Sequence, residues 1–146
     1  HITCGPEEIE KINPQRGAMR RRDGVNYVDD GYSRAIGYKD VRDDEFWVPG
    51  HIPGRPLYPG VLMIETAAQL AAFLMVKRRG KHHKPGQFIG FVGTDDVKFR
   101  NQVTPGQRLY IIGHELKYSL RRMVCAAQGV VDGSIVFEAK ITGMPI

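Results

Sequence analysis

The sequence predicts an α+β fold, in which one long buried helix packs against a strongly curved antiparallel sheet. The first observation is the segment Val61–Arg79, which has neither Gly nor Pro and in which thirteen of the first sixteen residues are apolar. The second is a set of five later segments rich in β-branched and aromatic residues, which is typical of strands. The third is the turn residues that separate these segments.

The length of 146 residues fits one domain, which we expect to span residues 1–146. Residues 1–14 are expected to form an N-terminal extension, with a short helix after Pro6. Hydrophobic residues make up 42% and charged residues 25% of the chain, which excludes a disordered or fibrous protein. Two cysteines, Cys4 and Cys125, are too few for a disulfide scaffold, and we expect both to be free thiols.

The first half of the chain predicts a hairpin, a loop and the long helix. Asn26–Val28 and Tyr32–Tyr38 flank the turn sequence Asp29–Gly31 and are expected to pair. Residues 40–60 contain four prolines and three glycines and are expected to form a loop. Val61–Arg79 then forms the helix, and its nearly all-round apolar surface predicts burial on nearly every side.

The second half predicts the rest of the sheet. Thr94-Asp95 is expected to be a turn between the first two segments, and Asp132-Gly133 is a strong signal for a two-residue hairpin. The expected strands are Phe88–Val92, Val97–Arg100, Arg108–Tyr118, Arg122–Val131 and Ser134–Thr142.

The net charge of +5 favours an acidic partner. No nucleic-acid motif is present, so no nucleic-acid partner is expected. The longest apolar stretch, Val61–Val76, is shorter than the about 20 residues of a membrane span and contains Glu65, so no membrane partner is expected.

No secretory signal opens the chain, which predicts a cytoplasmic protein. The adjacent His82 and His83 lack further ligands, and we expect no metal and no cofactor.

The candidate chemistry lies in one segment around the start of the helix. Glu65 is expected in the middle of the buried helix, and Gln69, four residues later, can bond its carboxyl group. His51 lies in a loop whose Pro and Gly residues restrict where its imidazole points. The helix begins at Gly60-Val61, where free N–H groups can hold a developing oxyanion.

This set of groups suits proton abstraction next to a carbonyl, with a base, an acid and backbone donors for an enolate. Serine or cysteine hydrolysis is not favoured, because the segment contains neither residue. The alternative is a purely structural role, in which His51 packs the loop and Glu65 pairs with a buried Arg.

The segment His51–Gln69 resembles the signature of FabZ-type 3-hydroxyacyl-[acyl-carrier-protein] dehydratases. The family pattern is His-Phe-Pro-Gly-x-Pro followed by Pro-Gly-Val-Leu-x-x-Glu-Ala-x-Ala-Gln. The stretch Gly93–Gln107 also resembles the family, and the resemblance covers roughly residues 12–142. It departs at Asn13–Met19, where Gly17 and Ala18 replace bulky side chains that help to line the family's substrate region.

The resemblance implies a hotdog fold and the dehydration of (3R)-hydroxyacyl-[acyl-carrier-protein] to the trans-2-enoyl thioester in fatty acid biosynthesis. It implies a homodimer, with a trimer of dimers as the larger assembly, in which His51 of one subunit and Glu65 of the other share a site. Gln69 then matches the supporting amide, and Gly60 and Val61 match the donors to the thioester carbonyl.

The resemblance also implies contacts with the substrate and its carrier. Lys98 and Arg100 match basic positions of the family, and together with Arg55 they are expected to bind the acidic acyl carrier protein. Tyr58 is bulkier than some residues at its position and is expected to narrow the acyl tunnel.

Three other functions stay open at this point. A hotdog thioesterase also uses an acidic residue on the helix, but it does not need the loop that carries His51. A non-catalytic relative would bind acyl carriers without turnover, although both candidate catalytic residues are intact. A nucleic-acid-binding module is supported only by the positive charge.

Overall fold

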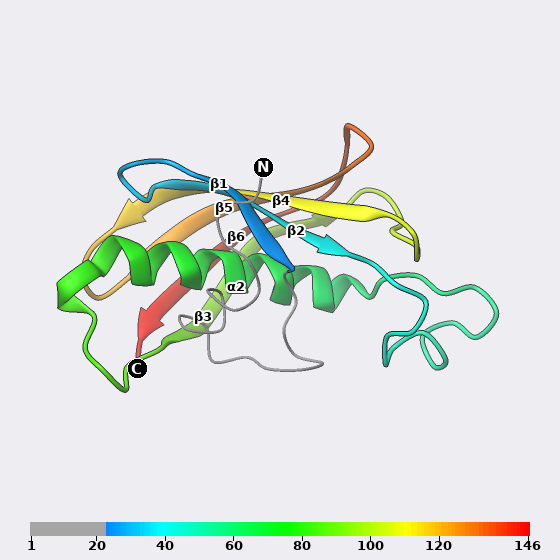
Figure 1. Cartoon of the computed structure of the whole chain (residues 1–146), viewed down its shortest axis with the longest axis horizontal. Coiled ribbons are helices and arrows are strands. Elements are labelled where there is room, and N and C mark those ends of the chain that lie inside the picture. Colours follow the sequence, from blue (N-terminus) through cyan, green and yellow to red (C-terminus); the bar gives the residue numbers. More distant parts are fainter. Residues whose placement is uncertain (1–22) are drawn as a thin grey trace.

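The computed structural model describes residues 23–146 and consists of one long helix, α2, against a six-stranded antiparallel sheet. The strand order is β1-β2-β4-β5-β6-β3, and the sheet curves along the helix (Figure 1). This arrangement confirms the predicted α+β class. The elements are β1 Gly24–Val28, β2 Arg34–Asp40, α2 Gly60–Arg79, the 3-10 turn η2 Gly80–His82, β3 Ile89–Phe99, β4 Arg108–Tyr118, β5 Met123–Val131 and β6 Ser134–Pro145.

Helix α2 buries one face against the sheet and leaves the other partly exposed. Leu70, Phe73 and Leu74 are at most 1% exposed and form the centre of the core with side chains from the strands. Val61, by contrast, is 72% exposed. The expectation of burial on nearly every side is therefore wrong for the single chain, because one sheet can cover only one face of a helix.

Two predicted turns are present with the geometry that their residues favour. Asp29 accepts hydrogen bonds from the backbone N–H groups of Ser33 and Arg34 at 2.7 and 2.9 Å, which closes the β1–β2 hairpin. Asp132 and Gly133 both have positive φ, 49° and 78°, as the tight β5–β6 hairpin requires. Local side-chain chemistry thus fixes both connections.

The region predicted as two strands is one continuous strand, β3. Thr94 and Asp95, expected to form a turn, pair instead with Ile141 and Lys140 of β6. The pairing between β3 and β6 shifts register twice, and one shift lies between Asp95 and Lys98. Asp96, inside this shift, has a φ of 52°. Asp96 and Val97, which lie between the paired residues Asp95 and Lys98, therefore form a bulge rather than part of a turn, because an edge strand tolerates an unpaired residue.

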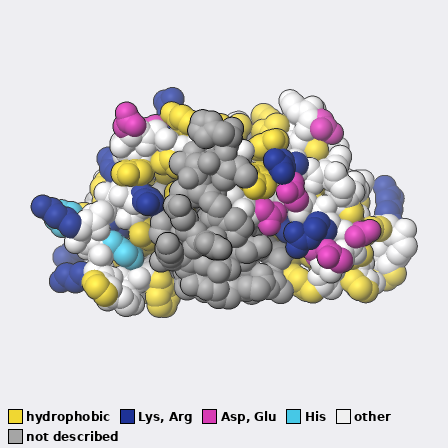
Figure 2. All heavy atoms as spheres, viewed as in Figure 1, with side chains coloured by type: hydrophobic (Ala, Val, Ile, Leu, Met, Phe, Trp, Pro, Cys, Tyr) yellow, Lys and Arg dark blue, Asp and Glu magenta, His cyan; other side chains and the backbone are white. Residues whose placement is uncertain are grey.

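The apolar composition of helix α2 would also suit a membrane span, but half of its most apolar stretch is buried inside the protein, as expected for a core helix. Basic side chains and histidines gather at the end of the molecule where α2 ends (Figure 2). The short helix expected after Pro6 and the segment Asn13–Met19 lie outside the described residues.

Candidate active site

The loop before helix α2 holds His51 in one orientation. The backbone N–H of His51 donates to Trp47 O at 2.8 Å, and its ring Nδ1 lies 2.7 Å from Leu57 O. A carbonyl oxygen only accepts hydrogen bonds, so Nδ1 is the donor, and in the neutral form of the ring the lone pair lies on Nε2. The loop therefore presents His51 as a base through Nε2.

Backbone strain follows directly after His51. Ile52 has a φ of 58°, a left-handed conformation that is costly for a β-branched residue. Its side chain is 46% exposed, so packing of the side chain in the core does not account for this conformation. The turn is closed by the N–H of Arg55, which donates to Ile52 O at 2.9 Å. Strain of this kind, worth about 1–3 kcal/mol, persists only where surrounding contacts fix the backbone, and it is often found at active sites.

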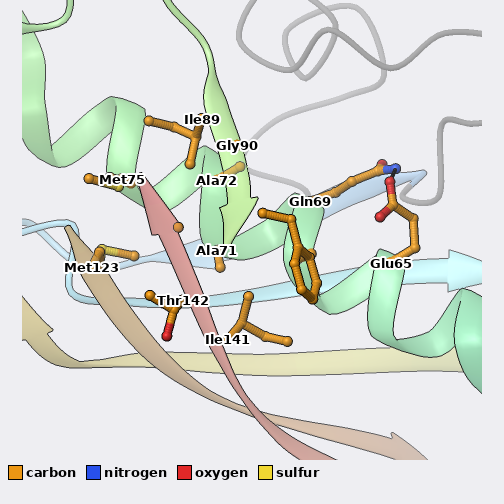
Figure 3. Close-up of a pocket in the computed structure, with 13 residues that line it drawn as sticks. Glu65, Gln69, Ala71, Ala72, Met75, Ile89, Gly90, Met123, Ile141 and Thr142 are labelled. Atoms are coloured by element: carbon orange, nitrogen blue, oxygen red, sulfur yellow. Dashed lines mark hydrogen bonds between the residues drawn. The ribbon is translucent and has the colours of Figure 1, made fainter. Parts of the chain in front are cut away.

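Glu65 and Gln69 lie one turn apart on α2 and open into a pocket (Figure 3). The amide Nε2 of Gln69 donates to Glu65 Oε1 at 2.9 Å, as the spacing predicted. Gln69 is 2% exposed, whereas Glu65 is only partly buried in the single chain. The burial that we expected for Glu65 in the middle of the helix is therefore only partial in one chain, and its side chain borders a pocket between α2 and strands β3 and β6.

The pocket beside Glu65 encloses about 50 Å³ and is mainly apolar. Glu65 and Gln69 lie on one side of the view in Figure 3, and Met75 and Met123 lie on the other. Small side chains of α2, including Ala71 and Ala72, leave the space open. Its wall also contains Ile89, Gly90 and Phe91 of β3 and Ile141, Thr142 and Gly143 of β6. The arrangement places the carboxyl group of Glu65 beside a small, mainly apolar pocket.

Helix α2 begins without a side-chain cap. Pro59 occupies the N-cap position and has no side chain that can bond the first N–H groups, which leaves those of Gly60 and Val61 as candidate donors. A Cβ atom at Gly60 would lie 2.8 Å from the ring of Phe99, so the absence of a side chain at Gly60 lets this ring lie against the start of the helix. Phe99 is a residue that the sequence reasoning missed, and no local pattern indicated this contact.

Tyr58 joins the loop to the helix. It is 2% exposed, its ring packs edge-on against Trp47 with centroids 5.4 Å apart, and its hydroxyl lies 3.0 Å from Thr66 Oγ1. Its N–H also donates to Val103 O at 2.7 Å. These contacts support the loop, and a direct substrate contact for Tyr58 stays a prediction.

The three predicted carrier-binding residues lie near the start of α2. Arg55 Nη2 lies 3.5 Å from Gln102 Oε1, which brings the loop beside the chain that follows β3. Arg100 and Lys98 lie on either side of Phe99, the residue that contacts Gly60. Arg100 is not a free cation, since its Nε donates to Glu138 Oε2 at 2.6 Å and lowers the pKa of that carboxyl group.

The structure does not join His51 to Glu65 by any hydrogen bond within residues 23–146. His51 bonds to the loop around it, and Glu65 bonds to Gln69 on the helix. The same residues contain no group of three or more His, Cys, Asp or Glu side chains placed to hold a metal ion.

A buried ion pair between Lys39 and Glu45 also escaped the sequence reasoning. Both residues lie in charged surroundings in the sequence, beside Asp40 and Asp44, which is the usual composition of a solvated surface. Only the tertiary structure shows that both side chains are buried.

The comparisons with known proteins agree with this geometry. The sequence model of the FabA-like domain matches residues 13–140. A protein of Rhizobium leguminosarum named 3-hydroxyacyl-[acyl-carrier-protein] dehydratase FabZ is 35% identical over 139 residues, with 94% of this chain and 86% of that protein covered. The protein of the same name from Bacillus subtilis is 34% identical over 138 residues, covering 93% of this chain and 94% of that protein.

Solved structures show the same fold at lower identity. The dehydratase heterocomplex ApeI:P from Xenorhabdus doucetiae superimposes with a TM-score of 0.79 at 16% identity, covering 94% of this chain and 90% of that one. S. sahachiroi AziG superimposes with a TM-score of 0.65 at 15% identity, covering 84% and 89% of the two chains. The expected hotdog fold is confirmed by the helix, the curved sheet and these neighbours. The chain belongs to the FabA-like family, together with the FabZ-type 3-hydroxyacyl-[acyl-carrier-protein] dehydratases.

Proposed function

We propose that this protein is a hydro-lyase of fatty acid biosynthesis that dehydrates (3R)-3-hydroxyacyl thioesters on acyl carrier protein to trans-2-enoyl thioesters. The observation that carries the proposal is the 2.7 Å contact of His51 Nδ1 with Leu57 O, which leaves Nε2 available as a base. The relatives that share this family bear the name of that activity. We place the reaction in the cytoplasm.

The proposed reaction needs one base, one acid and an oxyanion site. His51 Nε2 removes a proton from C2 of the substrate, and negative charge develops on the thioester oxygen. The N–H groups of Gly60 and Val61 stabilise that oxygen. Protonated Glu65, oriented by Gln69, gives its proton to the 3-hydroxyl group, so that the C3–O bond breaks, the C2–C3 double bond forms and water leaves.

We propose that two copies of the chain share each site. Strand β3 is an edge strand of eleven residues with Phe91, Val92 and Phe99 about half exposed, and the adjacent outer face of α2 is apolar and partly exposed. An open apolar edge of this kind favours pairing with another strand. A second copy on this edge would cover Glu65 and supply its own His51 to the carboxyl group.

The acyl chain would occupy the pocket beside Glu65, and the carrier would lie over the basic residues near the start of α2. Arg55, Lys98 and Arg100 are all exposed there. Acyl carrier proteins are acidic, so these cations would steer the encounter.

The direct test is to incubate the protein with 3-hydroxybutyryl and crotonyl thioesters of acyl carrier protein and of coenzyme A. The enoyl absorbance should rise with the 3-hydroxybutyryl thioesters, which are dehydrated. It should fall with the crotonyl thioesters, which are hydrated in the reverse reaction. The His51→Ala variant is the matched blank. Release of free thiol from the 3-hydroxybutyryl thioesters without a rise in enoyl absorbance would reject dehydration and favour the thioesterase.

A further inference from the structure

The buried ion pair between Lys39 and Glu45 stands out among the charged groups. Lys39 Nζ lies 3.0 Å from Glu45 Oε1, and the two side chains are 2% and 4% exposed. The other carboxylate oxygen, Oε2, accepts the backbone N–H of Arg42 at 2.8 Å. Burial alone would raise the pKa of Glu45, but the bonds from Arg42 and Lys39 outweigh it and keep the pKa below its usual value. The carboxylate is therefore charged at neutral pH.

Stability does not explain this pair. Removing two charges from water is expensive, and apolar residues of similar size often stabilise a core equally well or better. Of the ion pairs formed within residues 23–146, this is the only one in which both side chains are less than a tenth exposed. The neighbouring pair Asp40–Arg108 has both side chains 42% exposed. A charged pair in the core requires a reason other than burial energy.

The position of the pair supplies that reason. Lys39 lies on β2, which is paired on both sides, with β1 and with β4, whereas Glu45 lies in the turn that leads to His51. Glu45 O accepts the N–H of Val48 at 3.1 Å, and Trp47 O accepts the N–H of His51 at 2.8 Å. Glu45 thus connects the turn that carries His51 to a rigid strand.

The turn is also held from the side of the helix. Trp47 is 4% exposed and its ring packs against Tyr58, whose hydroxyl meets Thr66 next to Glu65. The ion pair and the aromatic contact therefore fix the turn from two directions.

We propose that the Lys39–Glu45 pair is a positioning device for His51, which fixes the place and tautomer of the imidazole through the turn 42–51. The proposal rests on the proposed function, in which His51 is the base. Both side chains are buried, so neither is accessible to a substrate. A displacement of about 1 Å in a reacting group can cost about a hundredfold in rate, so the rigid anchor serves the reaction rather than the fold.

The test compares three variants with the wild-type protein. Lys39→Met leaves the charge of Glu45 buried without the opposite charge of Lys39, and should lower both the melting temperature and kcat. The double variant Lys39→Met/Glu45→Leu removes both charges and should recover most of the melting temperature. It should keep kcat about 10–100-fold below wild type with KM within about threefold, because position 45 no longer accepts the N–H of Arg42. Arg108→Met breaks the adjacent exposed pair and should leave kcat unchanged.

A second measurement does not depend on activity. In the wild type, the ring N–H of His51 bonded to Leu57 should give a slowly exchanging NMR signal, assigned by its loss in His51→Gln. The signal should persist in Arg108→Met and be lost or exchange rapidly in the double variant. If wild type shows no dehydration, the proposed function fails, while this signal still decides the positioning role.

Recovery of kcat together with melting temperature in the double variant would overturn the proposal, as would an unchanged His51 signal. If Lys39→Met does not fold, Lys39→Arg and Glu45→Gln provide the same comparison. Lys39→Arg keeps the charge pair and should keep most of kcat, whereas Glu45→Gln removes the charge and should lower kcat. Equal kcat in these two folded variants would also overturn the proposal.

Discussion

The hydroxyl group of Tyr58 lies 3.0 Å from that of Thr66, and this contact joins the loop that carries His51 to the helical turn that carries Glu65. Thr66 Oγ1 also donates to Leu62 O at 2.7 Å, so the proton of Tyr58 points to Thr66. Both residues are buried. One buried hydrogen bond thus connects the supports of the two candidate catalytic groups of a chain.

We expect Tyr58→Phe to lower the free energy of unfolding by about 1 kcal/mol, the usual worth of one hydrogen bond. The ring would still pack against Trp47, so kcat should fall by at most about tenfold, or about 1.4 kcal/mol. Thr66→Ala should have a similar effect, and the double variant should be little worse than either single one. Full additivity in denaturant titrations and kinetics would show that the two hydroxyls act independently.

Replacement of either candidate catalytic residue should abolish most of the turnover. His51→Ala and Glu65→Gln should each lower kcat by about 10²–10⁴-fold, the usual contribution of a positioned base or acid. The control is His114→Ala, which removes an exposed histidine of β4 and should keep wild-type kcat. Near-wild-type turnover in a folded His51→Ala or Glu65→Gln protein would show that the residue is not catalytic.

Subunit exchange tests whether the site is shared. Mixing His51→Ala with Glu65→Gln should restore activity, because a mixed dimer has one site with both groups intact. Mass spectrometry should show the exchange, and each variant mixed with itself is the control. Exchange without any recovery would place both groups of a site in one chain.

Carrier docking should depend on charge near the start of α2. Lys98→Gln/Arg100→Gln should raise KM for the acyl carrier substrate and leave that for a short pantetheine thioester nearly unchanged. The wild-type KM for the carrier should rise with ionic strength, because exposed charges are screened beyond about 8 Å at 0.15 M salt.

The matched control for docking removes two positive charges near the other end of α2. Lys117→Gln/Arg121→Gln changes two exposed cations of the β4–β5 hairpin, whose Leu120 bonds the last turn of the helix through Arg79. It should not change KM for either substrate. An equal effect of both pairs of substitutions would assign the salt dependence to net charge rather than to a docking site.

The pocket beside Glu65 should limit the length of the acyl chain that the protein accepts. Ala72→Leu places a larger side chain in the pocket wall and should lower kcat/KM for longer acyl chains more than for the four-carbon substrate. Misfit of one methylene group is worth about 1–3 kcal/mol, which corresponds to about 10–200-fold. Ala126→Leu on the far face of the sheet is the control. Equal losses for short and long substrates would exclude this pocket as the acyl site.

The sequence by itself determined the helix, its place in the core and the two tight hairpins. Val61–Arg79 lacks residues that interrupt a helix, and Asp132-Gly133 favours a two-residue turn, so short-range chemistry is sufficient for both. The spacing of four residues likewise predicted the bond from Gln69 to Glu65. These features depend on residues close together in the chain.

Only the tertiary structure decided what depends on distant residues. Thr94 and Asp95 have the composition of a turn, but their pairing with β6 keeps them in a strand. The outer face of α2 is apolar, yet one sheet leaves it partly uncovered. Lys39 and Glu45 have the composition of a surface, but they are buried together because the turn before His51 folds back onto β2. Burial and pairing energies arise between segments far apart in the chain, and local patterns do not contain them.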